Sequence, residues 1–342
     1  MKKAAIRSIN YYLPEKTLTN AELAKDFPEW SAEQILTKTG ISTRHIAAKN
    51  ETASDLAFHA AQNLFSEGNY SAEDVDMVIL CTESPDYILP TSACTIQHRL
   101  GIPTTAGAFD INLGCSGYVY SLSIAKGLIE SGSASTVLLL TGNTYSKIMH
   151  PEDKNVRTIF GDAGTATLIQ GIESKEDLIG PFTFGTDGAG ANKLFVKVGG
   201  SRFSSASDIP DDQNEPREDG FPDSTLFMDG PSIFSFTLRV VPRMVKALFA
   251  KTNLNVDTID LFVFHQANSF MLEKLRRQSK IPEEKFLMNM KDIGNTVTSS
   301  IPIALTIAKK DGVLKNKQKL MLVGFGVGLS WAACLINNTW DN

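Results

Sequence analysis

The sequence predicts an α/β protein made of two similar halves, with mostly parallel sheets and helices packed on their faces. Apolar runs of strand length alternate with helix-period stretches along the 342 residues, which is typical of such sheets. The stretches also recur: "EDVDMVILCTES" at 73–84 matches "DTIDLFVFHQAN" at 257–268, and Gly142 matches Gly324. Two matching halves would build a layered molecule with pseudo-twofold symmetry.

In the first half, apolar periodicity and turn residues delimit six elements. They are, in order, a helix over 53–65, a strand within 73–84, a strand at 108–111, a helix from about 118 that ends before Gly132, a strand within 135–143 and a strand within 160–169.

The second half repeats most of this order. It predicts a helix over 234–250, a strand within 257–268, a helix within 294–312, a strand within 318–326 and a strand within 328–336. We place the halves at residues 1–175 and 176–342. The polar, acidic stretch 199–230, which is punctuated by Pro and Gly, predicts an extended surface loop.

Three side chains of reactive type fall at corresponding ends of these elements. Cys115 lies on the turn between a strand and a helix, where free N–H groups and the helix dipole favour a thiolate. His265 ends a strand of the second half, and Asn295 lies at the helix start that matches Cys115. Because such positions gather at one sheet edge, we expect a shared cleft. Taken singly, they could also be a core thiol, a core imidazole and a turn residue.

Composition narrows the class of protein. The net charge of −5 argues against a nucleic-acid-binding face. No apolar run is long enough to span a membrane, and the amino terminus lacks a secretory signal, so we expect a cytoplasmic protein. The four cysteines show no metal-ligand spacing, and we predict neither a metal nor a cofactor.

Six stretches, taken together, resemble the β-ketoacyl-acyl-carrier-protein synthase III family of the thiolase fold. They are "TKTGISTRHIA", "DINLGCSGYVYSLSIA", "RTIFGDAGTATL", "FHQANSFMLEKL", "KDIGNTVTSSIPIAL" and "GFGVGLSW". The resemblance implies a five-layered α-β-α-β-α architecture and a homodimer.

The resemblance also implies a decarboxylative Claisen condensation. Cys115 would accept an acyl group from acyl-coenzyme A or an acyl-carrier protein, and His265 with Asn295 would help malonyl-acyl-carrier protein lose carbon dioxide. The backbone N–H groups of Cys115 and Val327 would form an oxyanion hole. The family usually has glycine at position 327, but a backbone donor survives this change.

Several substrate contacts follow from the resemblance, with departures. Phe160 and Asn268 would contact substrate, and Leu89 stands where a phenylalanine often closes the partner subunit's primer pocket. Gln34 and Lys154 replace a tryptophan and an arginine that commonly hold adenine, which leaves open whether the donor is a coenzyme A ester or a carrier protein.

Docking of the acidic carrier protein departs from the family pattern as well. Phe270 replaces an arginine commonly found near the docked carrier, so Arg276 and Arg277 become the basic candidates.

Two other functions compete with condensation. The acylated Cys115 could modify another nucleophile without decarboxylation, or the chain could be a non-catalytic subunit of a condensing heterodimer. Retention of His265 and Asn295 favours condensation. Thiolase activity is less favoured, because no second cysteine lies in a Gly-rich loop near the carboxyl end.

Overall fold

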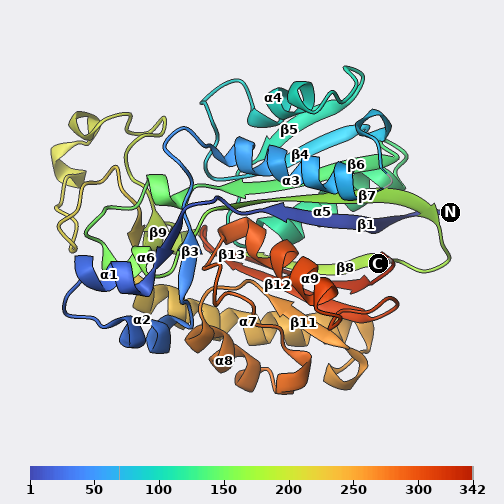
Figure 1. Ribbon diagram of the computed structural model, residues 1–342. Helices are drawn as coiled ribbons and strands as arrows, with labels where there is room; N and C mark the ends of the chain where they lie inside the picture. Colours follow the sequence, from blue (N-terminus) through green and yellow to red (C-terminus); the bar gives the residue numbers. More distant parts are fainter. Residues whose placement is uncertain (69, 341–342) are drawn as a thin grey trace.

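Two β-sheets run through the middle of the molecule (Figure 1). The computed structural model describes residues 1–68 and 70–340. The first sheet has the order β1-β7-β6-β4-β5 and consists of β1 (Lys2–Tyr12), β4 (Met77–Cys81), β5 (Gly107–Ile111), β6 (Thr136–Asn143) and β7 (Ala163–Glu173). The second has the order β11-β12-β13-β8 and consists of β8 (Ile179–Thr186), β11 (Leu261–Phe264), β12 (Lys319–Gly326) and β13 (Ser330–Asn337).

Helices form three layers around the two sheets. The outer face of the first sheet is covered by α3 (Ala53–Glu67) and α4 (Ser92–Arg99), whereas α5 (Gly117–Glu130) and α9 (Ser300–Lys310) contact both sheets and lie between them. The outer face of the second sheet carries α7 (Gly230–Thr252), and α8 (Ser269–Gln278) packs against α7. The predicted α-β-α-β-α architecture is confirmed.

The central layer follows the apolar pattern of the sequence. On α5, four apolar residues that recur at helical spacing are all buried: Tyr118, Leu122, Ala125 and Ile129. They pack in one core cluster with strand residues of both sheets, such as Ile79 and Leu322. The burial of this helix on two sides therefore ties the sheets together.

The expectation of mostly parallel sheets is wrong, because both sheets are mixed. β4 runs parallel to β5 and β6, and β11 runs parallel to β12, but the pairs β1–β7, β6–β7, β12–β13 and β8–β13 are antiparallel. Parallel neighbours need a crossover helix. The connection from β12 to β13 is the short turn 327–329. The connection from β6 to β7 contains only a 3₁₀ turn and the short helix α6 (Lys154–Arg157), and the chain turns back in both places instead of crossing over.

The two sheets share one strand order over four positions. β1-β7-β6-β4 corresponds to β8-β13-β12-β11, which matches the internal repeat of the sequence. The counterpart of β5 is reduced to one parallel bridge between Phe262 and Phe286. The boundary between the halves at residues 175 and 176 stays a prediction, since sheet membership alone does not define independent units.

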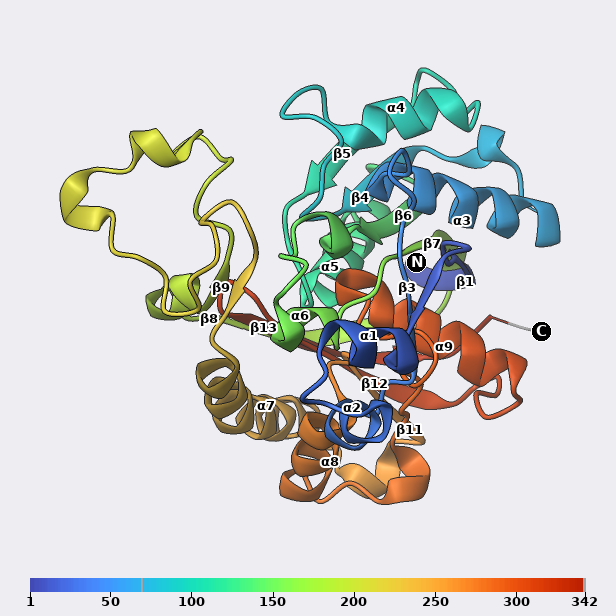
Figure 2. The same ribbon diagram turned by 60° about the vertical axis from the view of Figure 1, so that its left-hand side comes forward.

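Two excursions flank the layered core. One contains β2 (Thr17–Thr19), α1 (Asn20–Asp26), α2 (Ala32–Thr39) and β3 (Thr43–His45), and near it lies α6 (Lys154–Arg157). The other, called here the projecting segment, comprises residues 199–226 and stands away from the body in both ribbon views (Figure 2). Its base is the pair β9 (Leu194–Phe195) and β10 (Phe227–Met228).

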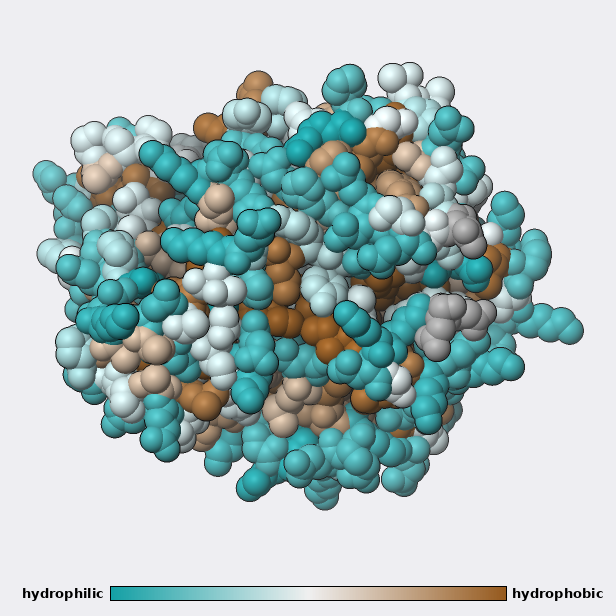
Figure 3. Space-filling model, viewed as in Figure 1, coloured by the Kyte–Doolittle hydropathy of each residue, from teal (hydrophilic) through white to brown (hydrophobic). Residues whose placement is uncertain are grey.

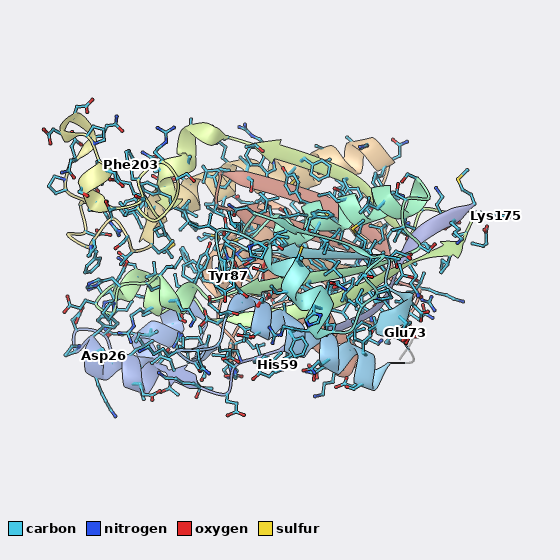
Figure 4. All side chains as sticks on the ribbon, turned by 90° about the horizontal axis from the view of Figure 1, so that it is seen from above. Asp26, His59, Glu73, Tyr87, Lys175 and Phe203 are labelled. Atoms are coloured by element: carbon cyan, nitrogen blue, oxygen red, sulfur yellow. The ribbon has the colours of Figure 1, made fainter. Side chains whose placement is uncertain are left out.

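The projecting segment is mostly exposed, but it has a small core that the sequence did not predict. Val198, Phe203 and Ile209 are buried against one another, and Figure 4 labels Phe203 within this lobe. Arg217 ties the segment together through Asp219, at 3.0 and 2.6 Å, and through the carbonyls of Pro222, Thr225 and Leu226.

The face of the molecule in Figure 3 is largely hydrophilic, with hydrophobic residues gathered toward its middle. Among the described residues, no helix is both long enough and apolar enough to cross a membrane.

Candidate active site

Cys115 lies between the end of β5 and the start of α5 and is 6% exposed. The backbone N–H groups of Cys115 and Val327 both hydrogen-bond to its sulfur. Gly326 packs directly on this side chain: a Cβ atom there would lie 2.9 Å from both Cβ and Sγ of Cys115. Only glycine leaves room for the nucleophile at this turn.

The thiol of Cys115 is protonated in the free protein. Burial raises its pKa, and the nearby Glu83 carboxylate raises it further, while the two backbone N–H groups lower it. The sequence predicts a thiolate favoured by the helix N-terminus, but burial outweighs that effect here because the charged sulfur would lose its hydration. A reaction at Cys115 therefore has to remove a proton.

His265 follows β11 directly, and its backbone N–H donates to the Val323 carbonyl at 2.8 Å. Its imidazole is 2% exposed. Burial lowers the pKa of His265 to about 3, with a hydrogen bond to the Val297 backbone opposing this. The ring is neutral at physiological pH, and its Nδ1 lies 2.8 Å from the Ser300 hydroxyl.

Asn295 is presented by a tight turn. Gly294 has φ +84°, in the left-handed region that glycine adopts without strain. The Asn295 Oδ1 accepts from the Val297 N–H at 3.0 Å. Because this bond fixes the amide, Nδ2 remains as the donor that can face a ligand. Asn295 thus combines a turn role with an available donor.

The three side chains open into one cavity of about 460 Å³. Phe160 and Asn268, which the sequence analysis assigned to substrate, line it too. The remaining wall is mainly apolar and includes Met228, Ile233, Phe234, Phe270 and Phe325. Such a cavity suits a flexible thioester chain with few polar groups beyond the reacting carbonyl.

Other predicted site residues lie outside the cavity. The Leu89 side chain is 78% exposed, on the segment between β4 and α4, and Tyr87 of the same segment is labelled in Figure 4. Gln34 caps α2, since its Oε1 accepts from the Ser31 N–H at 2.8 Å. Val327 lies beside Cys115 and contributes its backbone rather than its side chain.

Lys154 has an aromatic neighbour that the sequence analysis did not identify. Its Nζ lies 5.3 Å from the centre of the Trp30 ring, and Lys38 approaches the same ring at 3.8 Å. Lys154 also pairs with Glu29 at 2.7 Å. The sequence shows Trp30 just before the start of α2, but nothing in the sequence places it near Lys154. Only the tertiary structure brings Trp30 beside α6.

The basic candidates on α8 are partly neutralised. Arg276 and Arg277 both hydrogen-bond to Glu273, and these bonds lower the pKa of Glu273 to about 2. Arg277 remains 71% exposed. Phe270, on the same helix, is 55% exposed and stacks on Phe234 at 5.5 Å at the edge of the cavity.

Two family models match the chain. One described as "3-Oxoacyl-[acyl-carrier-protein (ACP)] synthase III" matches residues 109–188, and one described as the C-terminal part of the same enzyme matches residues 249–338. The first match contains Cys115, and the second contains His265 and Asn295.

Whole-chain relatives agree with these models. Enzymes named β-ketoacyl-[acyl-carrier-protein] synthase III from Caldanaerobacter subterraneus and Lactococcus lactis are each 35% identical, over 97% and 98% of this chain and 97% and 100% of theirs. A solved 3-oxoacyl-(acyl-carrier-protein) synthase III is 53% identical with a TM-score of 0.94, covering 98% of this chain and 99% of that one. A Burkholderia xenovorans 3-oxoacyl-(acyl-carrier protein) synthase is 34% identical with a TM-score of 0.91, covering 99% and 95%.

Proposed function

The chain belongs to the β-ketoacyl-acyl-carrier-protein synthase III family, and from this premise we propose how its residues divide the work of the reaction. It is an acyltransferase that condenses an acyl primer with malonyl-acyl-carrier protein, releasing carbon dioxide and a β-ketoacyl product. The observation that supports the assignment of roles is that Cys115, His265 and Asn295 line one cavity.

In the first step, Cys115 loses its proton and its sulfur attacks the carbonyl carbon of the primer thioester. The donor's C–S bond breaks, the donor leaves as a free thiol, and the acyl group remains on Cys115. The backbone N–H groups of Cys115 and Val327 converge beside the sulfur. They are therefore suited to stabilise the oxygen that becomes negative in the tetrahedral intermediate. Glycine at position 326 lets the end of β12 approach Cys115 closely enough for both N–H groups to reach the same oxygen.

In the second step, His265 and Asn295 bind the malonyl thioester oxygen. Loss of carbon dioxide leaves negative charge on that oxygen as an enolate, which two neutral hydrogen-bond donors stabilise without removing a proton. The low pKa of His265 keeps its ring neutral. The Ser300 hydroxyl, which accepts from the Gln266 N–H at 3.3 Å, directs its own proton to Nδ1 and leaves the ring proton on Nε2.

The enolate carbon then attacks the acyl group on Cys115. A carbon–carbon bond forms, the thioester bond to Cys115 breaks, and the β-ketoacyl group remains on the carrier protein. The mainly apolar wall, with Phe160 and Phe325 beside the reacting groups, keeps water away from the enolate.

We include in this proposal the residues that would bind the carrier protein and the acyl donor. Arg277, exposed on α8, the helix whose Phe270 lines the cavity, offers a positive charge to the acidic carrier protein. Lys154 and Gln34 would contact a nucleotide donor only in an altered way, since Gln34 caps a helix and Lys154 is paired with Glu29.

We also propose a cytoplasmic homodimer. Tyr87, Ile88 and Leu89 are 63%, 94% and 78% exposed in succession, an apolar patch that a second copy would cover. Leu89 would then reach the partner's primer pocket. A reducing compartment suits the chemistry, because Cys115 has to remain a thiol.

The test is a two-stage assay. The protein is incubated with a panel of acyl-coenzyme A and acyl-carrier-protein donors, and the mass added to Cys115 is measured. Malonyl-acyl-carrier protein is then added and the β-ketoacyl product is measured. Acylation followed by elongation supports the proposal, and the donor that acylates identifies the primer class.

Variants separate the two steps. His265→Ala and Asn295→Ala should keep acylation and each lose elongation by about 100- to 1000-fold, the usual effect of removing one such donor. Cys115→Ala should lose acylation altogether. If His265→Ala blocked acylation and elongation equally, the division of roles would be wrong.

A further inference from the structure

Glu83 is an acidic side chain beside the nucleophile to which the proposed reaction assigns no role. It follows β4, and its backbone N–H donates to the Asn143 Oδ1 at 3.0 Å. Its carboxylate accepts from the Tyr145 hydroxyl at 2.5 Å. A Cβ atom added to Gly114 would collide with Oε2 of Glu83, so the carboxylate lies against the residue that precedes Cys115.

Tyr145 joins this carboxylate to the wall of the cavity. The tyrosine is 3% exposed and belongs to the same buried cluster as Cys115 and Phe160. Its ring centre lies 5.1 Å from that of Phe160, which lines the cavity. Glu83 itself is half-buried.

The titratable groups that face Glu83 are uncharged at neutral pH. Burial raises the pKa values of Cys115 and Tyr145, and it raises that of Cys81 to about 12. Burial also raises the pKa of Glu83 to about 7, although the Tyr145 hydrogen bond lowers it. The carboxylate thus sits among neutral groups with a neutral hydrogen-bond donor as its partner.

An ionised Glu83 carboxylate against Gly114 and a thiolate at the neighbouring Cys115 disfavour each other. The Glu83 charge raises the pKa of Cys115, so two negative charges together are costly. Transfer of the thiol proton to the carboxylate avoids this cost, because the pair carries one negative charge before and after the transfer. A purely structural partner for Tyr145 would not need an acid, since a glutamine oxygen accepts the same hydrogen bond.

We propose that Glu83 accepts the Cys115 proton during acyl loading, with Tyr145 as its positioning residue. This inference rests on the proposed function, in which Cys115 is the nucleophile. The S–H bond of Cys115 breaks and its proton moves to a carboxylate oxygen of Glu83. The sulfur bonds to the donor's carbonyl carbon, the donor's thioester C–S bond breaks, and the departing thiolate takes a proton from solvent. Glu83 then releases its proton to solvent.

The expected pH dependence has a definite sign. Glu83 acts only when ionised, so the loading rate should rise as pH increases through about 7, the pKa of this carboxyl. Without Glu83, the rate should instead follow the small thiolate fraction of Cys115 and rise steadily to higher pH without that inflection.

The experiment measures alkylation of Cys115 by iodoacetamide, and its acylation by a donor active on the wild type, between pH 5.5 and 9. Glu83→Gln keeps the side chain's shape and the Tyr145 hydrogen bond. We expect it to slow both reactions by about 100-fold near pH 7.5 and to abolish the inflection. Tyr145→Phe should move the inflection to higher pH, because the hydroxyl lowers the pKa of Glu83.

Matched controls make the outcome decisive. Glu130→Gln removes a carboxylate from the far end of α5, where it pairs with Lys126, and should leave both profiles unchanged. Glu83→Gln that reacts as fast as or faster than wild type, or that slows acylation while sparing alkylation, would overturn the inference: the carboxylate would then restrain the thiol or contact only the primer. Failure of the wild type to acylate Cys115 would instead contradict the proposed function itself.

Discussion

In the proposed reaction, the contact of Ser300 with the imidazole Nδ1 determines which nitrogen of His265 carries the proton. Its hydroxyl accepts from the Gln266 N–H at 3.3 Å and lies 2.8 Å from the imidazole Nδ1. Ser300→Ala should therefore lower elongation by about tenfold, since one ordinary hydrogen bond is worth about 1 kcal/mol, while acylation of Cys115 is retained. The two-stage assay gives both rates.

Ser300→Thr is the control for this prediction, because it keeps the hydroxyl and should restore most of the elongation rate. A Ser300→Ala protein that lost acylation and elongation together would indicate a general packing defect at the start of α9 instead of an effect on the imidazole.

His265 also couples stability to pH. Its pKa is 6.5 when unperturbed and about 3 in the fold, so below pH 6.5 the unfolded state binds a proton that the folded state excludes. The contribution of the neutral His265 ring to the free energy of unfolding is fully present above about pH 6.5. It is lost as pH falls toward 3, by at most about 1.4 kcal/mol per pH unit. Urea denaturation at pH 7.5, 6 and 5 should show a steeper decline for wild type than for His265→Gln. Parallel declines would show that the buried ring does not govern this dependence.

Among single residues, the sequence predicts those whose functional role follows from their place at the end of a strand or near the start of a helix. Cys115 and His265 could be selected because each stands at the end of a strand or just before a helix. Asn295 was expected at a helix start, but it lies in the turn before α9, which begins at Ser300. Glu83, Ser300 and Trp30 could not be selected, although Glu83 also follows a strand. Their significance depends on neighbours distant in the chain: Tyr145 is 62 residues from Glu83, and Ser300 is 35 from His265.

Among the elements, helices and strands were predicted well where one apolar period runs unbroken. The helix expected at 53–65 forms as α3 (Ala53–Glu67), and the strand expected at 108–111 forms as β5 (Gly107–Ile111). Strand direction was predicted poorly. Periodicity identifies a strand but carries no information on whether the chain crosses over or turns back, as it does between β12 and β13.

The projecting segment owes its order to Arg217, whose side chain is 8% exposed although it lies in an acidic loop. Arg217→Ala removes its bonds to Asp219 and to three backbone carbonyls. We expect protease cleavage within residues 199–226 to accelerate at least about tenfold, with little change in the melting temperature of the layered core, because this segment lies outside the sheets.

The matched control for this element is Arg202→Ala, which removes an exposed arginine of the same segment and should leave cleavage unchanged. Repeating the digestion with an acyl donor tests whether the segment closes over the cavity, whose edge includes Met228 and Gly230. Equal cleavage with and without donor would exclude a lid role.

At the scale of the whole molecule, the two halves of the chain build one site together. The start of α5 packs on the second sheet, where Ser116 and Ser330 hydroxyls lie 2.6 Å apart. The start of α9 packs on the first sheet, where Ser299 and Thr141 hydroxyls lie 2.7 Å apart. Because each helix start meets the sheet of the other half, Cys115 and Asn295 arrive at one cavity despite their separation in sequence.

Because the site is built from both halves, the sequence predicts only part of it. The repeat spacing indicated that two helix starts should converge, and the cavity brings them together. The apolar wall around them could not be predicted, because it combines α7, α8 and the segment after α6, which belong to different parts of the chain.

The exposed apolar patch between β4 and α4 is where we expect a second copy of the chain to bind. Ile88 and Leu89 are 94% and 78% exposed, and β5 lies at the edge of the first sheet with β4 as its neighbour. Exposed apolar side chains next to an open sheet edge favour association with a second copy.

The double variant Ile88→Asp, Leu89→Asp should therefore shift the protein from dimer to monomer in sedimentation at micromolar concentration, with its circular dichroism unchanged. Acylation should also weaken, since Leu89 would no longer close the partner's pocket. Val313→Asp, which charges an apolar residue 48% exposed on another surface, should remain dimeric. A wild-type monomer, or a dimer that tolerates both charges, would place the interface elsewhere or exclude it.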